Sequence, residues 1–366
     1  MYVACTLKKI VLNLLILGIS LVSIVFAATE MNLYNESMIV SRNATQKEQD
    51  QAIRQAFKQL LVRVSGVRQV LDNEQIIEAL GKGAAYLATF RFESSDQLFT
   101  NVLGESVPTK KMILEFDKRS VDSLLVRNHL PVWSAKRPDI LIVLADRLQS
   151  ADHILADGEE SDLAEAVKRY ADQRGVPYQL PIMDLEDSLA FNFTSVYGLF
   201  STDIDAGAER YQPDAILTGR LSDVGNDQVQ ADWMVLFKNE RVRMPPVQGS
   251  IDDVVSQGID FISTRLSEQY ALLLDPQLLG ALTIQVSDVA SLKDFAALES
   301  YLKSINLITS VTLSQYSSEG AAFAIELSGD LTQLADVIAL DDKLIPVQEA
   351  TLEAQLDNVL RYQWQH

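Results

Sequence analysis

The residues that most often catalyse reactions or bind metals are sparse in this chain. The one cysteine is Cys5, and the three histidines, His129, His153 and His366, share no spacing that would bring them to one metal ion. A serine in a G-x-S-x-G turn, which would present a nucleophile, is also missing from the sequence. We therefore expect structural or solvated histidines, and the sequence assigns no catalytic, cofactor-binding or metal-binding residue.

Two acidic runs are the other candidates for chemistry. Residues 157–162, DGEESD, offer oxygen ligands for a calcium ion, but they lack the Asp-x-Asp-x-Asp-Gly order, and carboxylates ahead of a helix also favour its dipole. Residues 184–187, DLED, follow Pro181 in a loop where ligands of an α/β sheet often bind, although a solvated loop has the same composition. With 50 acidic residues in the chain, pairs of carboxylates arise by chance and predict no glycosidase.

The N-terminus predicts export. Lys8 and Lys9 precede an apolar run over residues 10–26, and small residues at Val25 and Ala27 suit a signal peptidase. We expect a signal peptide over residues 1–27 and a periplasmic mature protein that is not inserted in the membrane. The alternative is an uncleaved anchor in the inner membrane, because the apolar run approaches the roughly 20 residues that span a bilayer.

Charge and cysteine content restrict the partners and the source of stability. The net charge of −19 becomes more negative once the two lysines of the signal peptide are removed, and such a surface repels phosphate backbones. Nucleic acid is therefore excluded as a partner. Because the mature chain contains no cysteine, its stability has to come from packed cores and not from disulfides.

Residues 30–129 predict a small α+β module. A strand over residues 33–41 is followed by Thr45 and Glu48, whose side chains form a capping box for a long amphipathic helix. Shorter helices are expected over residues 74–80 and 120–128. Two further strands are expected over residues 85–94 and 110–117, which completes one sheet against the long helix.

The segment over residues 130–138, LPVWSAKRP, is interpreted as a linker. Trp133, Lys136 and Arg137 form either a recognition cluster for a partner or a clamp at a hinge. Pro131 and Pro138 fix the backbone around them and disfavour a helix, which favours the clamp.

Residues 139–277 predict an α/β module with a mixed sheet. The run DILIVLAD at residues 139–146 is continuously apolar, as in a strand that is covered on both faces. A helix capped by Ser161 follows it, then a strand near residues 176–181. Residues 215–224 and 229–237 form an antiparallel pair, and a closing helix is expected over residues 252–274.

The C-terminal part predicts two further pieces. Residues 281–346 read strand, helix, two paired strands and helix, which is typical of a ferredoxin-like module. Residues 347–366 are expected to form an amphipathic tail in which Leu352, Leu356, Val359 and Leu360 dock on a neighbour. Trp364 is either the anchor of this tail or a contact for another protein.

Several of these segments resemble a known family. The helix QAFKQLLVRVSGV, the strand ATFRF, the segment LEFD and the stretch LPVWSAKRPDILIVLADR resemble domain-of-unknown-function family 2066, uncharacterised envelope proteins of gammaproteobacteria, over most of residues 30–275. The family has no established catalytic residues, so the resemblance assigns no role to any residue of this chain. The order of elements in the middle module is similar to the periplasmic modules of the TolB N-terminal and curli-secretion lipoprotein type, which bind other envelope proteins.

These patterns together favour a non-catalytic protein over an enzyme. We expect a periplasmic factor that binds an envelope protein or assists assembly, with Trp133, Lys136, Arg137 and Trp364 as the candidate partner contacts. Two alternatives stay open at this point. One is a carboxylate-dependent hydrolase of an envelope polymer, and the other is a small-ligand receptor with its site at a module junction.

Overall fold

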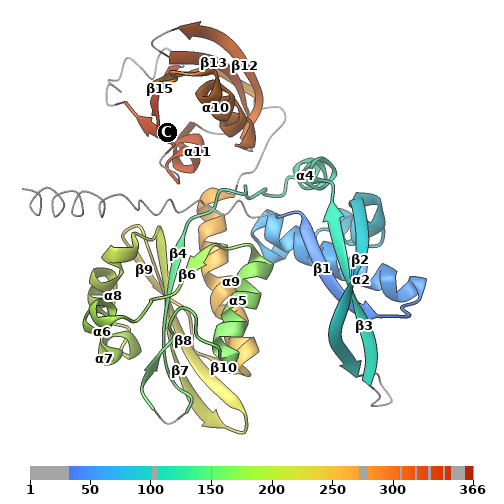
Figure 1. Ribbon diagram of the computed structural model, residues 1–366, viewed down its shortest axis with the longest axis vertical. Coiled ribbons are helices and arrows are strands. Elements are labelled where there is room, and N and C mark those ends of the chain that lie inside the picture. The colour runs from blue at the N-terminus through green and yellow to red at the C-terminus, as the bar shows by residue number, and fades with distance from the viewer. Residues whose placement is uncertain are drawn as a thin grey trace, which may run out of the picture. The chain divides into compact units, whose positions relative to one another are not determined.

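Three β-sheets, each with its own helices, organise the part of the chain that the structure describes (Figure 1). The computed structural model describes residues 33–100, 106–149, 151–271, 279–305, 307–317, 320–328, 331–340, 343–347 and 359–365. The predicted fold class, α/β and α+β over several modules, is confirmed. The predicted signal peptide, residues 1–27, lies outside the described residues. Within them, no helix combines the length and the apolarity needed to cross a membrane.

The N-terminal module is an antiparallel sheet of order β1-β3-β2, backed by the long helix α2. The predicted capping box is present, with Thr45 and Glu48 bonded to each other's backbone amides at the start of α2. Because β3 lies in the middle, β1 and β2 are the two edges of the sheet. The elements are β1 (Asn35–Ser41), α2 (Gln46–Ser65), η1 (Arg68–Asp72), α3 (Glu74–Leu80), η2 (Gly83–Tyr86), β2 (Leu87–Thr100), β3 (Ser106–Phe116) and α4 (Lys118–Arg127).

The core of this module follows from the apolar stripe of α2. Phe57 and Leu60 are fully buried against Met112 and Leu114 of β3. The Phe57 ring stacks on Phe116 with ring centroids 5.4 Å apart. Helical spacing on α2 and alternation on β3 therefore meet in one layer, as the sequence pattern predicted.

The middle module is a mixed sheet of order β10-β8-β7-β4-β5, with β6 beside β4 and β9 beside β8. Strand β4 pairs parallel with β7, and β7 pairs antiparallel with β8. The elements are β4 (Ile140–Arg147), β5 (His153–Ile154), α5 (Asp162–Arg174), β6 (Tyr178–Gln179), α6 (Leu185–Ala190), α7 (Phe193–Tyr197), α8 (Ser201–Ala208), η3 (Glu209–Tyr211), β7 (Ala215–Gly225), β8 (Gln228–Phe237), β9 (Glu240–Arg243), β10 (Val247–Gly249) and α9 (Ile251–Tyr270).

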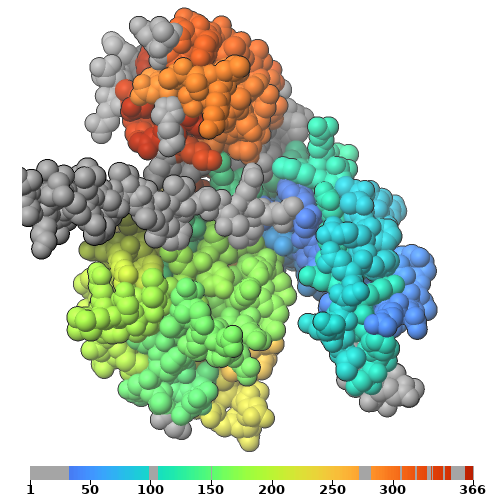
Figure 2. Space-filling model, viewed as in Figure 1, coloured from blue at the N-terminus to red at the C-terminus, as the bar shows by residue number. Residues whose placement is uncertain are grey.

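Helices cover both faces of this sheet. Ile140, Ile142 and Leu144 of β4 pack with α5 and α9, while Leu141 and Val143 pack with α7 and α8, and α6 lies against α8. In space-filling view the latter three helices form one surface of the module (Figure 2). The uninterrupted apolar run of β4 is explained by this burial on both sides. Helix α9 ends at Tyr270, earlier than the predicted residue 274, because Ala271 is already extended.

The C-terminal sheet has the order β12-β13-β11-β15-β14. Its first strands and helices follow the predicted sequence of strand, helix, two paired strands and helix. The elements are β11 (Leu279–Ser287), α10 (Leu292–Ser304), β12 (Ile308–Ser317), β13 (Gly320–Ser328), α11 (Leu331–Ile338), β14 (Leu344–Pro346) and β15 (Val359–Trp364).

The predicted amphipathic tail is wrong for the residues that the structure describes. Residues 359–364 form β15, which lies between β11 and β14, parallel to the first and antiparallel to the second. In a ferredoxin-like sheet the strand after the second helix would pair with β11, but here β15 takes that place and β14 is moved to the edge. Alternation places Tyr362 and Trp364 in the core, where leucines at helical spacing had suggested a docked helix. Leu352 and Leu356 lie outside the described residues.

We expect Trp364→Ala to unfold the C-terminal module at lower urea concentration. Trp364 is 7% exposed and its ring meets that of Tyr301 edge-on at 5.9 Å, so truncation should cost about 3–5 kcal/mol of the free energy of unfolding. Circular dichroism during urea titration measures the change. Arg361→Ala, on the exposed face of the same strand, should stay within about 0.5 kcal/mol. Equal effects of both changes would contradict the placement of β15.

Candidate functional site

The linker residues lie where two helices end side by side. Helix α2 ends at Gly66, with φ of 78°, and helix α5 ends at Gly175, with φ of 62°, so both caps are left-handed. Residues 32–366 form one compact unit, and contacts between its modules belong to the fold. We call the cluster around these two helix ends the seam. It consists of Arg63, Gly66, Trp133, Arg137, Arg174 and Gly175.

Arg137 is the centre of the seam. Its Nη2 donates to the carbonyl of Arg63 at 2.7 Å, and its Nη1 donates to the carbonyls of Arg174 and Gly175 at 2.7 and 2.8 Å. Its Nε donates to the carbonyl of Ser134 at 3.1 Å. One guanidinium thus bonds the last carbonyls of both helices, where the helix dipoles are negative and a cation is stabilised.

The charge of Arg137 is balanced by carbonyl dipoles in place of a carboxylate. Burial lowers the pKa of Arg137, and the nearby cations Arg63 and Arg174 lower it further. Every hydrogen-bond partner named above is an acceptor, so the arrangement fits the fully protonated guanidinium. The group also stacks on Trp133, with its central carbon 4.1 Å from the ring centroid.

Two more buried arginines complete the seam. Arg63 bonds the Glu36 carboxylate and the carbonyl of Asn35. Arg174 donates from Nη2 to the carbonyl of Gly66 at 2.7 Å and lies 3.2 Å from Asp260 of α9. Arg174 therefore joins α5 to the N-terminal module at Gly66, and Arg68 of that module pairs with Asp260, which joins the module to α9.

The two glycines allow the backbones to come this close. A Cβ at Gly66 would lie 2.3 Å from the Cβ of Ser267, and one at Gly175 would lie 2.8 Å from Cδ of Arg63. Ser267 also donates to the carbonyl of Gly66 at 3.0 Å. No other residue type fits at either helix end without moving the partner element.

Three of the four candidate partner contacts from the sequence are buried, and the fourth, Lys136, is half-buried. Trp133 is 1% exposed and Arg137 is 6% exposed, both in the seam, and Trp364 belongs to the C-terminal core. Lys136 has its Nζ 3.1 Å above the ring of Tyr301. The structure brings Trp133 and Arg137 together as a clamp, so we no longer propose these four residues as a surface for a partner.

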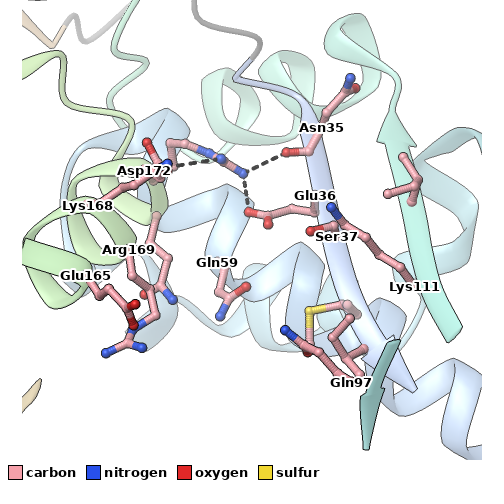
Figure 3. A pocket seen from close by; sticks show the side chains of 15 residues that line it. Asn35, Glu36, Ser37, Gln59, Gln97, Lys111, Glu165, Lys168, Arg169 and Asp172 are labelled. Atoms are coloured by element: carbon pink, nitrogen blue, oxygen red, sulfur yellow. Dashed lines mark hydrogen bonds and ion pairs between the residues drawn. The ribbon is translucent and has the colours of Figure 1, made fainter. Parts of the chain in front are cut away.

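A cleft of about 860 Å³ opens beside the seam, between β1 and α5 (Figure 3). We call it the β1 cleft. One wall is the consecutive stretch Asn35–Ile39 of β1, with Lys111 and Ile113 of β3 beside it. Gln59 and Arg63 come from α2, and the opposite wall is the polar side of α5 from Glu165 to Gln173.

The free edge of β1 faces this cleft. The carbonyl of Tyr34 accepts from Phe116, and Arg42 donates to the carbonyl of Pro108, which fixes the hydrogen-bonding phase of the ladder between β1 and β3. The even-numbered residues of β1 therefore bond β3, and Ser37 and Ile39 direct their backbone groups outward. The same phase directs the carbonyl of Asn35 outward, and Arg63 donates a hydrogen bond to it.

Charges of both signs line the β1 cleft. Burial raises the pKa of Glu36, although Arg63 opposes the rise, and burial also raises the pKa of Asp172. Lys168 and Arg169 project from α5, and Arg169 pairs with Asp252. Such a lining can bind polar and charged groups, but it holds no cysteine, histidine or hydroxyl–base pair with which to start a nucleophilic reaction.

The acidic runs singled out in the sequence have local partners. Glu159 bonds His153 at 3.0 Å, and Ser161 caps α5 as predicted. In the second run, Asp184 caps α6 and pairs with Arg210, whose hydrogen bond lowers the pKa of Asp184 to about 2. Asp187 is buried beside the same arginine. The described residues contain no cluster of three or more metal-ligating side chains.

His153 is clamped between two carboxylates. Its Nδ1 lies 2.6 Å from buried Asp146 and its Nε2 lies 3.0 Å from Glu159. Burial lowers the pKa of His153, but the hydrogen bonds and charges of Asp146 and Glu159 outweigh it, and the net pKa is raised. The imidazolium therefore holds the loop between β4 and α5 to the end of β4.

The sequence did not predict the β1 cleft. A strand over residues 33–41 was predicted, but whether a strand is central or at an edge depends on long-range pairing. One signal was present: Asn35, Ser37 and Ser41 are polar at alternate positions, which suits a strand with one exposed side.

One family model matches the N-terminal part of the chain. Residues 27–134 match a family model described as "Domain of unknown function (DUF8605)". This range contains β1, α2, β2 and β3 and ends inside the linker, one residue after Trp133. No curated protein matches the chain.

We expect Arg137→Leu to lower the free energy of unfolding by about 2–4 kcal/mol, because buried carbonyls at two helix ends lose their donor. Arg137→Lys should recover little of this, since an ammonium cannot bond both helix ends with a planar fork. Chemical denaturation measures both.

Arg127→Leu, at the exposed end of α4, is the control and should stay within about 0.5 kcal/mol. If Arg127→Leu lowered the free energy of unfolding as much as Arg137→Leu does, the hydrogen bonds of Arg137 would not account for the effect.

We expect the His153 clamp to stabilise the fold at low pH. Because the folded pKa is raised above the unfolded value of about 6.5, the stabilisation is complete below that pH and is lost as the pH rises through the folded pKa. The difference in free energy of unfolding between the wild type and His153→Gln should shrink accordingly. Glu159→Gln should reduce the pH dependence, and a difference that does not vary with pH would contradict the clamp.

Proposed function

We propose that this chain is a non-catalytic periplasmic factor that binds an envelope protein or assists its assembly. The observation that carries the proposal is the β1 cleft, where an unpaired strand edge faces a polar helix across an open groove. The N-terminal sequence pattern supports export, and the resemblance to domain-of-unknown-function family 2066 supports an envelope setting. The similarity of the middle module to periplasmic modules of the TolB N-terminal type adds an analogy of fold.

The backbone edge favours a protein partner over a small ligand. Small-molecule sites are mostly apolar and enclose their ligand, whereas the β1 cleft is open and its lining is largely charged or amide-bearing. Outward backbone groups of a strand bind polypeptide backbone in many recognition modules. A receptor for a small apolar ligand therefore has little support.

The hydrolase alternative has one observation in its favour. Glu36 and Asp172 both line the cleft, and burial raises the pKa of each. A general acid must be protonated and free to reach its substrate. Glu36 instead bonds the Arg63 guanidinium, which favours the ionised form and occupies the carboxylate. We therefore prefer binding to catalysis.

We expect a photo-crosslinking amino acid at Ile39 to capture a discrete envelope protein in living cells, because this exposed side chain borders the cleft. The same amino acid at Val224, which is 44% exposed at the end of β7, should give no such adduct. Mass spectrometry identifies the adduct. A discrete adduct at neither position, with export verified, would reject the binding function. Release of fragments from purified envelope polymer, lost in Asp172→Asn, would establish the hydrolase instead.

A further inference from the structure

We propose that the β1 cleft takes one extended segment of a partner protein, which adds to the edge of β1 as a fourth strand of the N-terminal sheet. The inference deepens the proposed function and rests on it. It names the occupant as polypeptide backbone in strand conformation, recognised at Ser37 and Ile39 and flanked by side chains of β3 and α5.

The free backbone groups set the register of the added strand. Ile39 directs both its N–H and its carbonyl into the cleft, and neither has a partner among the described residues. The N–H of Ser37 is hydrogen-bonded to the Glu36 carboxylate, but its carbonyl points outward without a bond in the same part of the chain. Ser41 presents an outward N–H, while its carbonyl accepts from Ala44.

The seam limits the added strand at one end. Arg63 already bonds the carbonyl of Asn35, so pairing cannot continue past Ser37 toward the start of β1. Because Arg63 is itself held by Glu36 and buried, this stop is rigid. The available edge is thus Ser37–Ser41, a short strand with Ile39 at its centre.

Helix α5 explains why the open edge of β1 does not pair with the edge of another sheet. Unpaired strand edges promote aggregation unless something covers them. Here the polar side of α5 stands across the cleft, with Glu165, Lys168 and Arg169 among the lining residues (Figure 3). The groove of about 860 Å³ has the size of an ordinary binding pocket, so it suits one extended chain better than another sheet.

The flanking side chains select the residues of the partner strand. In the register of the sheet, Ile39 lies opposite Lys111, and Ser37 lies opposite Ile113, on one face. A residue placed opposite Ile39 shares this face, where the exposed side chain of Ile39 and that of Ile113 offer apolar contact. Lys111 has no ion pair among the described residues and can bind a carboxylate. We infer a segment that alternates aliphatic with acidic or hydroxyl residues.

The test uses the full mature chain and a fluorescent peptide in which valine alternates with aspartate and threonine. Ile39→Pro removes the outward N–H but no ladder bond, and proline is tolerated at such edge positions. We expect it to weaken peptide binding, measured by fluorescence anisotropy, at least about tenfold. Ser94→Pro, which removes an outward N–H on the opposite edge strand β2, should leave the affinity unchanged. Equal binding by the wild type and Ile39→Pro overturns the proposal.

Hydrogen exchange tests the same idea on the unmodified sequence, in case Ile39→Pro fails to fold. With the peptide bound, the amides of Ile39 and Ser41 should become protected, whereas those of Met38 and Val40 are already protected by β3. Protection that appears on β2, or nowhere, overturns the proposal.

Side-chain selection has its own control. Lys111→Glu should weaken binding of the peptide about threefold, because it removes the partner of the peptide's carboxylates. Lys58→Glu, on α2 outside the cleft, should leave the affinity unchanged.

Two other outcomes distinguish this proposal from dimerisation of the chain and from binding without strand addition. A concentration-dependent dimer that Ile39→Pro abolishes would make a second copy of this chain the occupant, which overturns a partner segment. If the envelope protein identified by crosslinking in cells co-purifies equally well with Ile39→Pro and with the wild type, the binding function stands and the strand addition fails.

Discussion

The fold depends on one buried cation that serves two helices. Arg137 donates to the terminal carbonyls of α2 and α5, groups that would otherwise be unsatisfied in a buried interface. The negative ends of both helix dipoles converge on its guanidinium, which explains how a charge is held there without a carboxylate. Glycines at both helix ends let the carbonyls approach, and Trp133 closes the other side of the cation.

This constraint creates the candidate site. Once the C-terminal ends of α2 and α5 are fixed side by side, the polar side of α5 stands across from the edge of β1, and the space between them is the β1 cleft (Figure 3). Arg63 belongs to both features, because it takes part in the seam and also occupies the outward carbonyl of Asn35. A rigid scaffold with an unpaired backbone edge is an economical way to recognise extended polypeptide, since the main chain supplies the hydrogen bonds and few side chains are needed.

The C-terminal module illustrates how local pattern and tertiary pairing compete. Leucines at helical spacing in the tail favoured a helix, whereas residues 359–364 form a strand that is inserted between β11 and β14. Tyr362 and Trp364 alternate into the core, and the gain from burying two large aromatic side chains outweighs the weaker local preference. The strand arrives from the far end of the chain, a pairing that no window of local sequence contains.

The sequence alone determined most elements of the fold, because their signals are local. The capping box at Thr45, the apolar run of β4 and the alternating strands of the C-terminal module all follow from spacing within a few residues. It also predicted that the linker around Trp133 and Arg137 is a clamp between modules, since prolines stiffen it. Only the tertiary structure decided which carbonyls Arg137 bonds, that β1 is an edge strand, and that α5 faces it. These facts depend on residues more than thirty positions apart along the chain, such as Arg137 and Arg174. Contact between such residues produces no periodic pattern in the sequence.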